Sequence, residues 1–274
     1  MSKDWGEPKL GELLELERIE ENLYRGWCHQ GSPQRAFGGQ VAAQALTAAG
    51  STVVEDRPVH SLHGYFVRGG RTDTPIVYEV ERTRDGGSFS TRRVVAIQGG
   101  ETIFSLSASF QRDATSSEHQ AAMPADVVAP ELVEHVQIER LPVRASAIEL
   151  RYIGDPNTGL PDEGRGPRQR LWVRARDPLP DSPLAHVCAL TYISDIRLAG
   201  TVGMIHQNDP GEPQYASLDH AVWFHRPFRA DEWLLFDMYS PNYASTRGLA
   251  HGEFFTRDGL LVASVTQEVL IRRR

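Results

Sequence analysis

Hydrophobic and polar residues along this chain fall into runs that predict strands, and glycine-rich turns separate the runs. In the first half the strand-like runs cover 59–67, 76–83, 88–97 and 103–111. Strands that follow one another through short turns usually pair antiparallel. The first half therefore predicts an antiparallel meander.

Two segments predict helices that accompany these strands. Val41–Ala49 is rich in small residues and ends at Gly50, which is typical of a tightly packed helix that stops at a glycine. In the second half, Ser182 and Pro183 supply a polar N-cap and a proline at the first helical position. The helix that they begin is expected to run from about residue 184 to residue 193 or 195.

The second half of the chain repeats the order of strands and turns of the first half, 158 residues later. Phe66-Val67-Arg68 returns as Phe224-His225-Arg226, and the run 102–109 returns as 260–267. Identity between the copies is weak, but the order is kept. The repeat predicts an α+β fold in which two helix-plus-antiparallel-sheet units join equivalent sheets.

The predicted domain boundaries follow from this repeat. Residues 1–112 form the first unit, 113–166 a linker, and 167–274 the second unit. The linker contains several prolines and turn residues, with one strand-like run at 147–152. The run 170–176 is the first predicted strand of the second unit.

Charge and composition restrict the partners and the compartment. The chain has 29 Lys and Arg against 36 Asp and Glu, a formal net charge of −7, which argues against non-specific binding of nucleic acid. Cys28 and Cys188 are the two cysteines, so no disulfide framework is expected and a reducing compartment fits. The N-terminal segment lacks a signal-peptide pattern, and no apolar run is long enough to span a membrane. We expect a cytoplasmic protein with no membrane partner.

Asp195 is the first candidate catalytic residue. At 100° per residue, Leu184, Cys188, Thr191 and Asp195 lie along one largely apolar stripe of the second helix, so the Asp195 carboxylate is expected to point inward. Burial and the negative end of the helix dipole both disfavour the charged carboxylate there. The alternative is a carboxylate that caps a neighbouring loop or pairs with Arg197.

Several blocks in fixed order resemble the acyl-CoA thioesterase II family, and together they cover nearly the whole chain apart from the linker. The blocks are Phe37-Gly38-Gly39-Gln40, 59–66 (VHSLHGYF), 84–90 (RDGGSFS), 192–195 (YISD), 218–227 (LDHAVWFHRP) and 252–255 (GEFF). The resemblance implies a double hotdog, in which each unit has a long helix wrapped by an antiparallel sheet. It also implies that the two sheets join edge to edge as one continuous sheet.

The resemblance further implies a function and three catalytic residues. The activity is hydrolysis of a fatty acyl-CoA to a free fatty acid and CoA, by a water that an Asp, a Ser or Thr and a Gln hold and activate. These positions match Asp195, Ser217 and Gln267 in this chain, with Ser217 where the best-known members have Thr. At the 158-residue offset, Gln267 lies opposite Ser109 and Ser217 opposite Val59, which predicts one competent site per chain.

Four further residues are candidate substrate contacts. Phe37, Gly38 and Gly39 are expected to line the shared groove, where glycines would let the backbone approach the substrate and leave amides free as oxyanion donors. A close contact between the helix and the sheet explains the glycines equally well. His60 is a candidate substrate contact at the site.

Other chemistries fit the residues less well. His60 and His63 share a strand face but lack a third ligand at metal-site spacing, so neither a metal nor any other cofactor is expected. Asp219, His220 and His225 look like parts of a triad, but no GxSxG serine accompanies them.

Two alternative functions stay open. A hotdog enoyl-CoA hydratase or dehydratase would need a His beside Asp195, and the helix of Asp195 offers only His186. A non-catalytic acyl-CoA-binding protein would keep the groove and lose the three polar residues. The expected partners are acyl-CoA as substrate and further copies of the chain, in a homodimer or a homotetramer.

Overall fold

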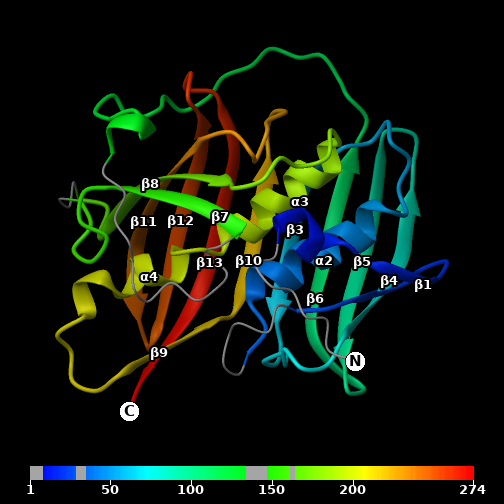
Figure 1. The fold of residues 1–274 in the computed structure, drawn as a ribbon, viewed down its shortest axis with the longest axis horizontal. Coiled ribbons are helices and arrows are strands. Elements are labelled where there is room, and N and C mark those ends of the chain that lie inside the picture. Colours follow the sequence, from blue (N-terminus) through cyan, green and yellow to red (C-terminus); the bar gives the residue numbers. More distant parts are fainter. Residues whose placement is uncertain (1–8, 29–34, 134–146, 161–163) are drawn as a thin grey trace.

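The computed structural model describes residues 9–28, 35–133, 147–160 and 164–274. Parts of the predicted linker, residues 134–146 and 161–163, lie outside the described residues. Within the described ranges the structure has short helices and thirteen strands in one sheet (Figure 1). No helix in these ranges is long and apolar enough to cross a membrane.

The strands of the first half belong to one side of the sheet. They are β1 (Glu17–Glu20), β2 (Leu23–Gly26), β3 (Val59–Phe66), β4 (Ile76–Asp85), β5 (Phe89–Gln98) and β6 (Glu101–Gln111). β3 to β6 correspond to the four runs of the predicted meander, with ends that differ by at most two residues. Each pair of neighbours in this half is antiparallel.

The second half supplies the other strands. They are β7 (Ile148–Ile153), β8 (Arg168–Ala175), β9 (Pro213–Ser217), β10 (Asp219–Phe224), β11 (Leu234–Ala244), β12 (Arg247–Thr256) and β13 (Leu261–Arg273). The order across the sheet is β1-β2-β4-β5-β6-β3-β10-β13-β12-β11-β8-β7, and β9 pairs with β13 beside this path. The two halves therefore form one continuous antiparallel sheet, as predicted.

The halves join through β3 and β10, which lie next to each other in the middle of the sheet (Figure 1). In this antiparallel pair Tyr65 faces Asp219, Gly64 faces His220 and Ser61 faces Trp223. The repeat is visible in the strand positions, because β11 and β12 each begin 158 residues after β4 and β5. Backbone hydrogen bonds of the β3–β10 pair hold the two units in one register.

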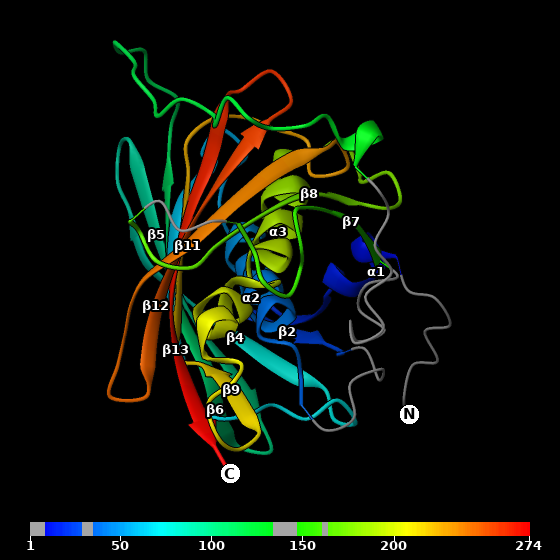
Figure 2. The same ribbon diagram turned by 90° about the vertical axis from the view of Figure 1, so that its left-hand side faces the viewer.

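The helices lie on one side of the sheet, which curves around them (Figure 2). They are α1 (Leu10–Leu14), α2 (Gly38–Gly50), α3 (Pro183–Ser194) and α4 (Leu198–Gly203), with 3-10 turns at Pro130–Leu132 and Met204–His206. As predicted, Ser182 is the N-cap of α3 and Pro183 its first residue. The α3 segment is buried on nearly all faces from Cys188 onward, so the predicted apolar stripe is one part of a wholly buried surface.

Close approach of α2 and α3 depends on glycines at both ends of α2. A Cβ on Gly39 would lie 2.6 Å from the Tyr192 carbonyl oxygen, and a Cβ on Gly50 would lie 2.4 Å from the Leu184 side chain. Between these glycines α2 carries mostly alanines, which are fully buried. The small side chains let the two helices pack against each other over their length, and this contact aligns the N-terminus of α2 with the C-terminus of α3.

The outer face of the second half carries a separate hydrophobic cluster. Trp172, Trp233, Leu235, Phe255 and Leu261 form it, and Met123, Val127, Val133 and Ile153 pack against it. The described part of the predicted linker thus covers the sheet face opposite the helices. The strand expected inside the linker is β7, which pairs with β8 and forms an edge of the sheet.

We expect Gly64→Ala to destabilise the fold at the β3–β10 junction. A Cβ on Gly64 would lie 2.4 Å from the Phe104 ring, which is itself fully buried, so the core must shift to accept one methyl group. Overpacking of this kind costs about 1–3 kcal/mol. The free energy of unfolding in urea measures the effect, with Gly87→Ala as control because a Cβ on Gly87 meets nothing within 4 Å. Equal stability of the two variants would contradict the tight junction.

Candidate active site

Asp195 is the C-cap of α3 and lies at the centre of the candidate site. Its backbone is still helical, with φ −82° and ψ −6°, and the side chain points into the interior with 9% of its surface exposed. The predicted inward orientation is therefore found. Arg197 does not pair with Asp195, because its guanidinium donates to the Gln169 side chain and to the Pro156 carbonyl.

Two side chains from distant segments meet at this carboxylate. The Gln267 amide, from β13, donates to Asp195 Oδ1 over 2.9 Å and also donates to Ser217 Oγ. The Ser217 hydroxyl, at the end of β9, lies 3.5 Å from the same Asp195 oxygen. Gln267 is fully buried and Asp195 is buried, whereas Ser217 is half-buried. The three predicted catalytic residues thus form one hydrogen-bonded cluster.

The second carboxylate oxygen is held by the first half of the chain. Asp195 Oδ2 accepts a hydrogen bond of 2.7 Å from the backbone amide of Gly39, in the first turn of α2. The first amides of a helix have no partner within the helix, and the helix dipole places partial positive charge there. The N-terminus of α2 therefore stabilises the anionic carboxylate at the C-terminus of α3.

This contact changes the interpretation of the Phe37-Gly38-Gly39 segment. The amide of Gly39 was expected to be free as an oxyanion donor, but it is occupied by Asp195. A Cβ on Gly38 would lie 2.9 Å from both Asp195 Oδ2 and the Phe66 ring. The glycines are thus needed for close approach of the carboxylate and of α3. The contact of Gly38 with Phe66 of β3 is also the close helix–sheet contact that was the alternative explanation. Phe37 packs its ring edge-on against Tyr192 of α3, with 4.9 Å between the ring centres.

His60 does not join the three catalytic candidates. Its Nε2 lies 2.8 Å from Ser109 Oγ, and its ring packs edge-on against Phe89 at 5.8 Å. Burial and the charge of His63 lower the pKa of His60. An irregularity between Val59 and Ser61 in the β3–β6 pairing turns the His60 side chain toward the half-buried Ser109 rather than toward the helices.

The triad-like residues of β10 serve separate purposes. Asp219 Oδ1 accepts a hydrogen bond of 2.6 Å from the backbone amide of Glu268, and His225 Nε2 lies 2.9 Å from Ser264 Oγ. His220 instead enters the interior of the protein and is 1% exposed. Its Nδ1 lies 3.2 Å from Gln267 Oε1 and its Nε2 lies 2.8 Å from Ser194 Oγ.

His220 and Ser194 are the site residues that sequence reasoning missed. The signal was the period of two in β10, where His220, Val222 and Phe224 share the buried face. The helix of Asp195 alone offered only His186, which lies at the other end of α3 and contacts the Ala230 amide. Sheet pairing, which the chain order does not reveal, brings His220 into the cluster.

The strand registers of the structure correct which residue of the first half is equivalent to Gln267. The 158-residue offset placed Gln267 opposite Ser109, but the sheet places it one residue away. Ala221 pairs with Thr266 in the second half, which sets His220 beside Gln267, whereas Leu62 pairs with Ala108 in the first half. The residues equivalent to His220 and Gln267 are thus Leu62 and Ala108, both buried and apolar. The first half has no copy of this polar pair.

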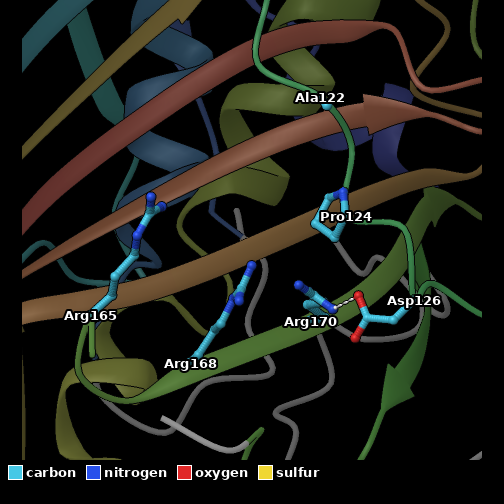
Figure 3. A pocket seen from close by; sticks show the side chains of 6 residues that line it. All are labelled: Ala122, Pro124, Asp126, Arg165, Arg168 and Arg170. Carbon is cyan, nitrogen blue, oxygen red and sulfur yellow. Dashed lines mark hydrogen bonds and ion pairs between the residues drawn. The ribbon is translucent and has the colours of Figure 1, made fainter. Parts of the chain in front are cut away.

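Two cavities lie away from this cluster. One, of about 480 Å³, lies on the outer face and is lined by Ala122, Pro124, Asp126, Arg165, Arg168 and Arg170 (Figure 3). Two of its three arginines pair with carboxylates, because Arg168 and Arg170 both bind Asp237 and Arg170 also binds Asp126. The other cavity, of about 280 Å³, is mostly apolar and lies between α1 and the beginning of α3.

The fold and this cluster define the chain as a double hotdog protein with a carboxylate, an amide and a hydroxyl at the contact of its two helices. Two family models match it: "Acyl-CoA thioesterase N-terminal domain" over residues 24–111 and "Acyl-CoA thioesterase" over residues 149–270.

Individual proteins give the same result. Acyl-coenzyme A thioesterase 8 of Rattus norvegicus is 41% identical over 96% of this chain and 88% of its own length. The crystal structure of an acyl-CoA thioesterase II from Mycobacterium marinum is 47% identical, with a TM-score of 0.86, and the match covers 97% of this chain and 98% of that one. A hot dog fold protein from Alicyclobacillus acidocaldarius, at 20% identity and a TM-score of 0.83 over 97% and 98% of the two chains, shares the fold. The chain belongs to the acyl-CoA thioesterase II family.

We expect Gly39→Ala to lower turnover by displacing Asp195. The new Cβ would lie 2.6 Å from the Tyr192 carbonyl oxygen, a backbone atom that cannot rotate away, so α2 and α3 must separate and weaken the bond between the Gly39 amide and the carboxylate. A displacement of about 1 Å at a catalytic group can reduce the rate by roughly 10²-fold. Release of CoA thiol from an acyl-CoA measures the rate.

Gly11→Ala is the matched control for this substitution. Gly11 also lies in the first turn of a helix, α1, but a Cβ there would only touch Leu179 at 3.9 Å. Its activity should equal that of the unmodified protein. Full activity of folded Gly39→Ala would contradict the role of the helix contact in holding the carboxylate.

Proposed function

We propose that this acyl-CoA thioesterase hydrolyses fatty acyl-CoA to a free fatty acid and CoA through a water that Asp195 activates, held by Ser217 and Gln267. The convergence of these three side chains carries the proposal. Asp195 is the C-cap of α3, Ser217 ends β9 and Gln267 lies in β13. The Ser217 hydroxyl and the Gln267 amide nevertheless both lie within hydrogen-bonding reach of one carboxylate oxygen, Asp195 Oδ1. Full-length similarity to acyl-CoA thioesterases supports the substrate class.

The chemistry needs one base and a group that fixes the water. Asp195 Oδ1 accepts a proton from the water as its oxygen attacks the thioester carbonyl carbon. The half-buried Ser217 hydroxyl can bind the attacking water as well as the carboxylate. Gln267 donates its two N–H groups to Asp195 Oδ1 and Ser217 Oγ, so it holds the water by fixing the two groups that bind it. The tetrahedral intermediate then expels the CoA thiolate, which takes up the proton from Asp195. Water adds to the acyl group, CoA leaves as the thiol, and no covalent acyl-enzyme is needed.

The first half of the chain contributes positioning. The Gly39 amide orients the carboxylate, so that Oδ2 is held and Oδ1 faces Ser217 and Gln267. Gly38 and Phe37 lie at the same end of α2, and Gly38 is in contact distance of the carboxylate. We therefore propose that residues 37–39 form the wall along which the thioester approaches Asp195. A contact between His60 and the substrate would lie outside this cluster.

We expect Asp195→Asn to reduce turnover by roughly 10²–10⁴, the range for loss of a general base. The amide keeps the shape of the side chain but accepts a water proton very poorly. CoA thiol release from a panel of acyl-CoAs of different chain length measures turnover, and circular dichroism reports the fold. Asp113→Asn, a change at an exposed aspartate, is the control. A folded Asp195→Asn variant with near-normal turnover would refute the proposal.

The other two residues have graded effects in the same assay. Gln267→Ala is expected to lose less than Asp195→Asn, because it removes a group that orients the water and leaves the base. Ser217→Thr keeps the hydroxyl and should be tolerated. Parallel measurement of enoyl-CoA hydration tests the alternative activity, and binding of acyl-CoA without either reaction would identify a non-catalytic acyl-CoA-binding protein.

We expect the chain to act in the cytoplasm as a homodimer or homotetramer. The outer sheet face at the β3–β10 junction carries Tyr65 and Trp223, with 67% and 36% of their surfaces exposed, and His63 packs edge-on against Trp223. Exposed aromatic side chains on a sheet face favour association with another surface. Light scattering coupled to size exclusion measures the mass, and a monomer at micromolar concentration would contradict this expectation.

A further inference from the structure

Besides Asp195 and Ser217, which accept from its NH₂ group, the Gln267 amide has a third polar neighbour at its oxygen Oε1. His220, on β10, is buried and reaches across to β13, where its Nδ1 lies 3.2 Å from Gln267 Oε1. The other ring nitrogen, Nε2, lies 2.8 Å from the hydroxyl of Ser194, the last residue of α3. His220 therefore connects the catalytic amide to the end of the helix that carries Asp195.

The carboxylate dictates which way the Gln267 amide faces. An ionised Asp195 only accepts hydrogen bonds, so the group 2.9 Å from its Oδ1 must be the NH₂ of Gln267. The same NH₂ donates to Ser217 Oγ. An amide turned by 180° would place Oε1 against the carboxylate and leave Ser217 without this donor. A partner that holds Oε1 therefore also holds the NH₂ toward the other two catalytic residues.

Only one neutral tautomer of His220 fits this arrangement. Gln267 Oε1 accepts and cannot donate, so Nδ1 of His220 must carry the proton. Burial lowers the pKa of His220, so the ring is neutral near pH 7 and Nε2 carries no proton. Nε2 then accepts from the Ser194 hydroxyl. The Ser194 hydroxyl also lies 2.9 Å from the Thr191 carbonyl oxygen. Because the hydroxyl has one proton, it donates that proton to His220 Nε2 in this tautomer.

We propose that His220 is a positioning residue of the active site: as the Nδ1–H tautomer it donates to Gln267 Oε1 and fixes both N–H groups of that amide toward Asp195 and Ser217. Three groups then donate in sequence: Ser194 to His220, His220 to Gln267, and Gln267 to both the carboxylate and Ser217. The proposal rests on the proposed catalytic role of these three residues. His220 does not touch the substrate in it.

The first half of the chain supports a dedicated role. The equivalent pair there is Leu62 and Ala108, so the sheet accepts apolar residues at these two positions without difficulty. Burial of a histidine and an amide at the same places costs free energy unless every polar atom is paired. The polar pair occurs only in the half whose strands also carry Ser217, which is the pattern expected for a functional network.

Two substitutions of His220 separate donation from packing. The side-chain nitrogen of an asparagine can take the place of the histidine Nδ1–H, so His220→Asn keeps a donor to Gln267 Oε1. His220→Leu keeps an apolar side chain of the kind found at Leu62 and removes the donor. We expect His220→Leu to lower kcat by about 10-fold to 10²-fold with little change in KM, and His220→Asn to recover most of that loss. His225→Asn, at a histidine that contacts only Ser264 in this region, is the control.

The tautomer is measurable without any assay of activity. Nitrogen-15 NMR of histidine-labelled protein distinguishes a protonated Nδ1 from a protonated Nε2, and His220→Asn identifies the resonance. A neutral ring with the proton on Nδ1 at pH 7 is the expected result. A proton on Nε2, or on both nitrogens, would overturn the proposed orientation of Gln267, whether or not His220→Leu folds.

The outcomes separate this inference from the proposed function. If Asp195→Asn is inactive while folded His220→Leu retains full kcat, the positioning role is wrong and the catalytic assignment stands. If Asp195→Asn retains full activity, the catalytic assignment fails and the positioning role fails with it. Equal losses in His220→Leu and His220→Asn, with both variants folded, would show that packing of the ring and not its donor matters, and would also refute the proposal.

Discussion

The candidate active site depends on one contact between helix ends, the hydrogen bond from the Gly39 amide to the Asp195 carboxylate. A buried carboxylate at the C-terminus of its own helix is electrostatically disfavoured as an anion, because the dipole of α3 places partial negative charge there. The N-terminus of α2 supplies the opposite partial charge and an unpaired amide at the same point. The N-terminus of α2 thus offsets the unfavourable end of the α3 dipole at the carboxylate.

This contact explains why the proposed catalytic cluster belongs to both repeats although its side chains come from one. β3 and β10 fix the halves in one sheet, and the small residues of α2 let α3 approach until Gly39 reaches Asp195. A single hotdog unit could supply the carboxylate, the hydroxyl and the amide. It could not supply the second helix N-terminus that completes the environment of the carboxylate.

The difference between the halves is chemical rather than architectural. Equivalent strands pair in the same order in both halves, yet a buried His and Gln in one half correspond to Leu62 and Ala108 in the other. The second half therefore holds a buried polar pair beside Asp195. The first half has apolar residues at the two equivalent positions and contributes a helix end.

Local pattern in the sequence determined the strands of the meander, the two main helices, their repeat and the inward orientation of Asp195, because alternation and helical spacing are properties of neighbouring residues. Resemblance of short blocks added Ser217 and Gln267. The tertiary structure alone decided that the Gly39 amide is bound by Asp195, that His60 lies apart, and that His220 contacts Gln267. These facts depend on strand register and helix approach, which are set by pairing and packing between residues far apart in the chain. A one-residue shift of register is enough to make Ala108, and not Ser109, the residue equivalent to Gln267.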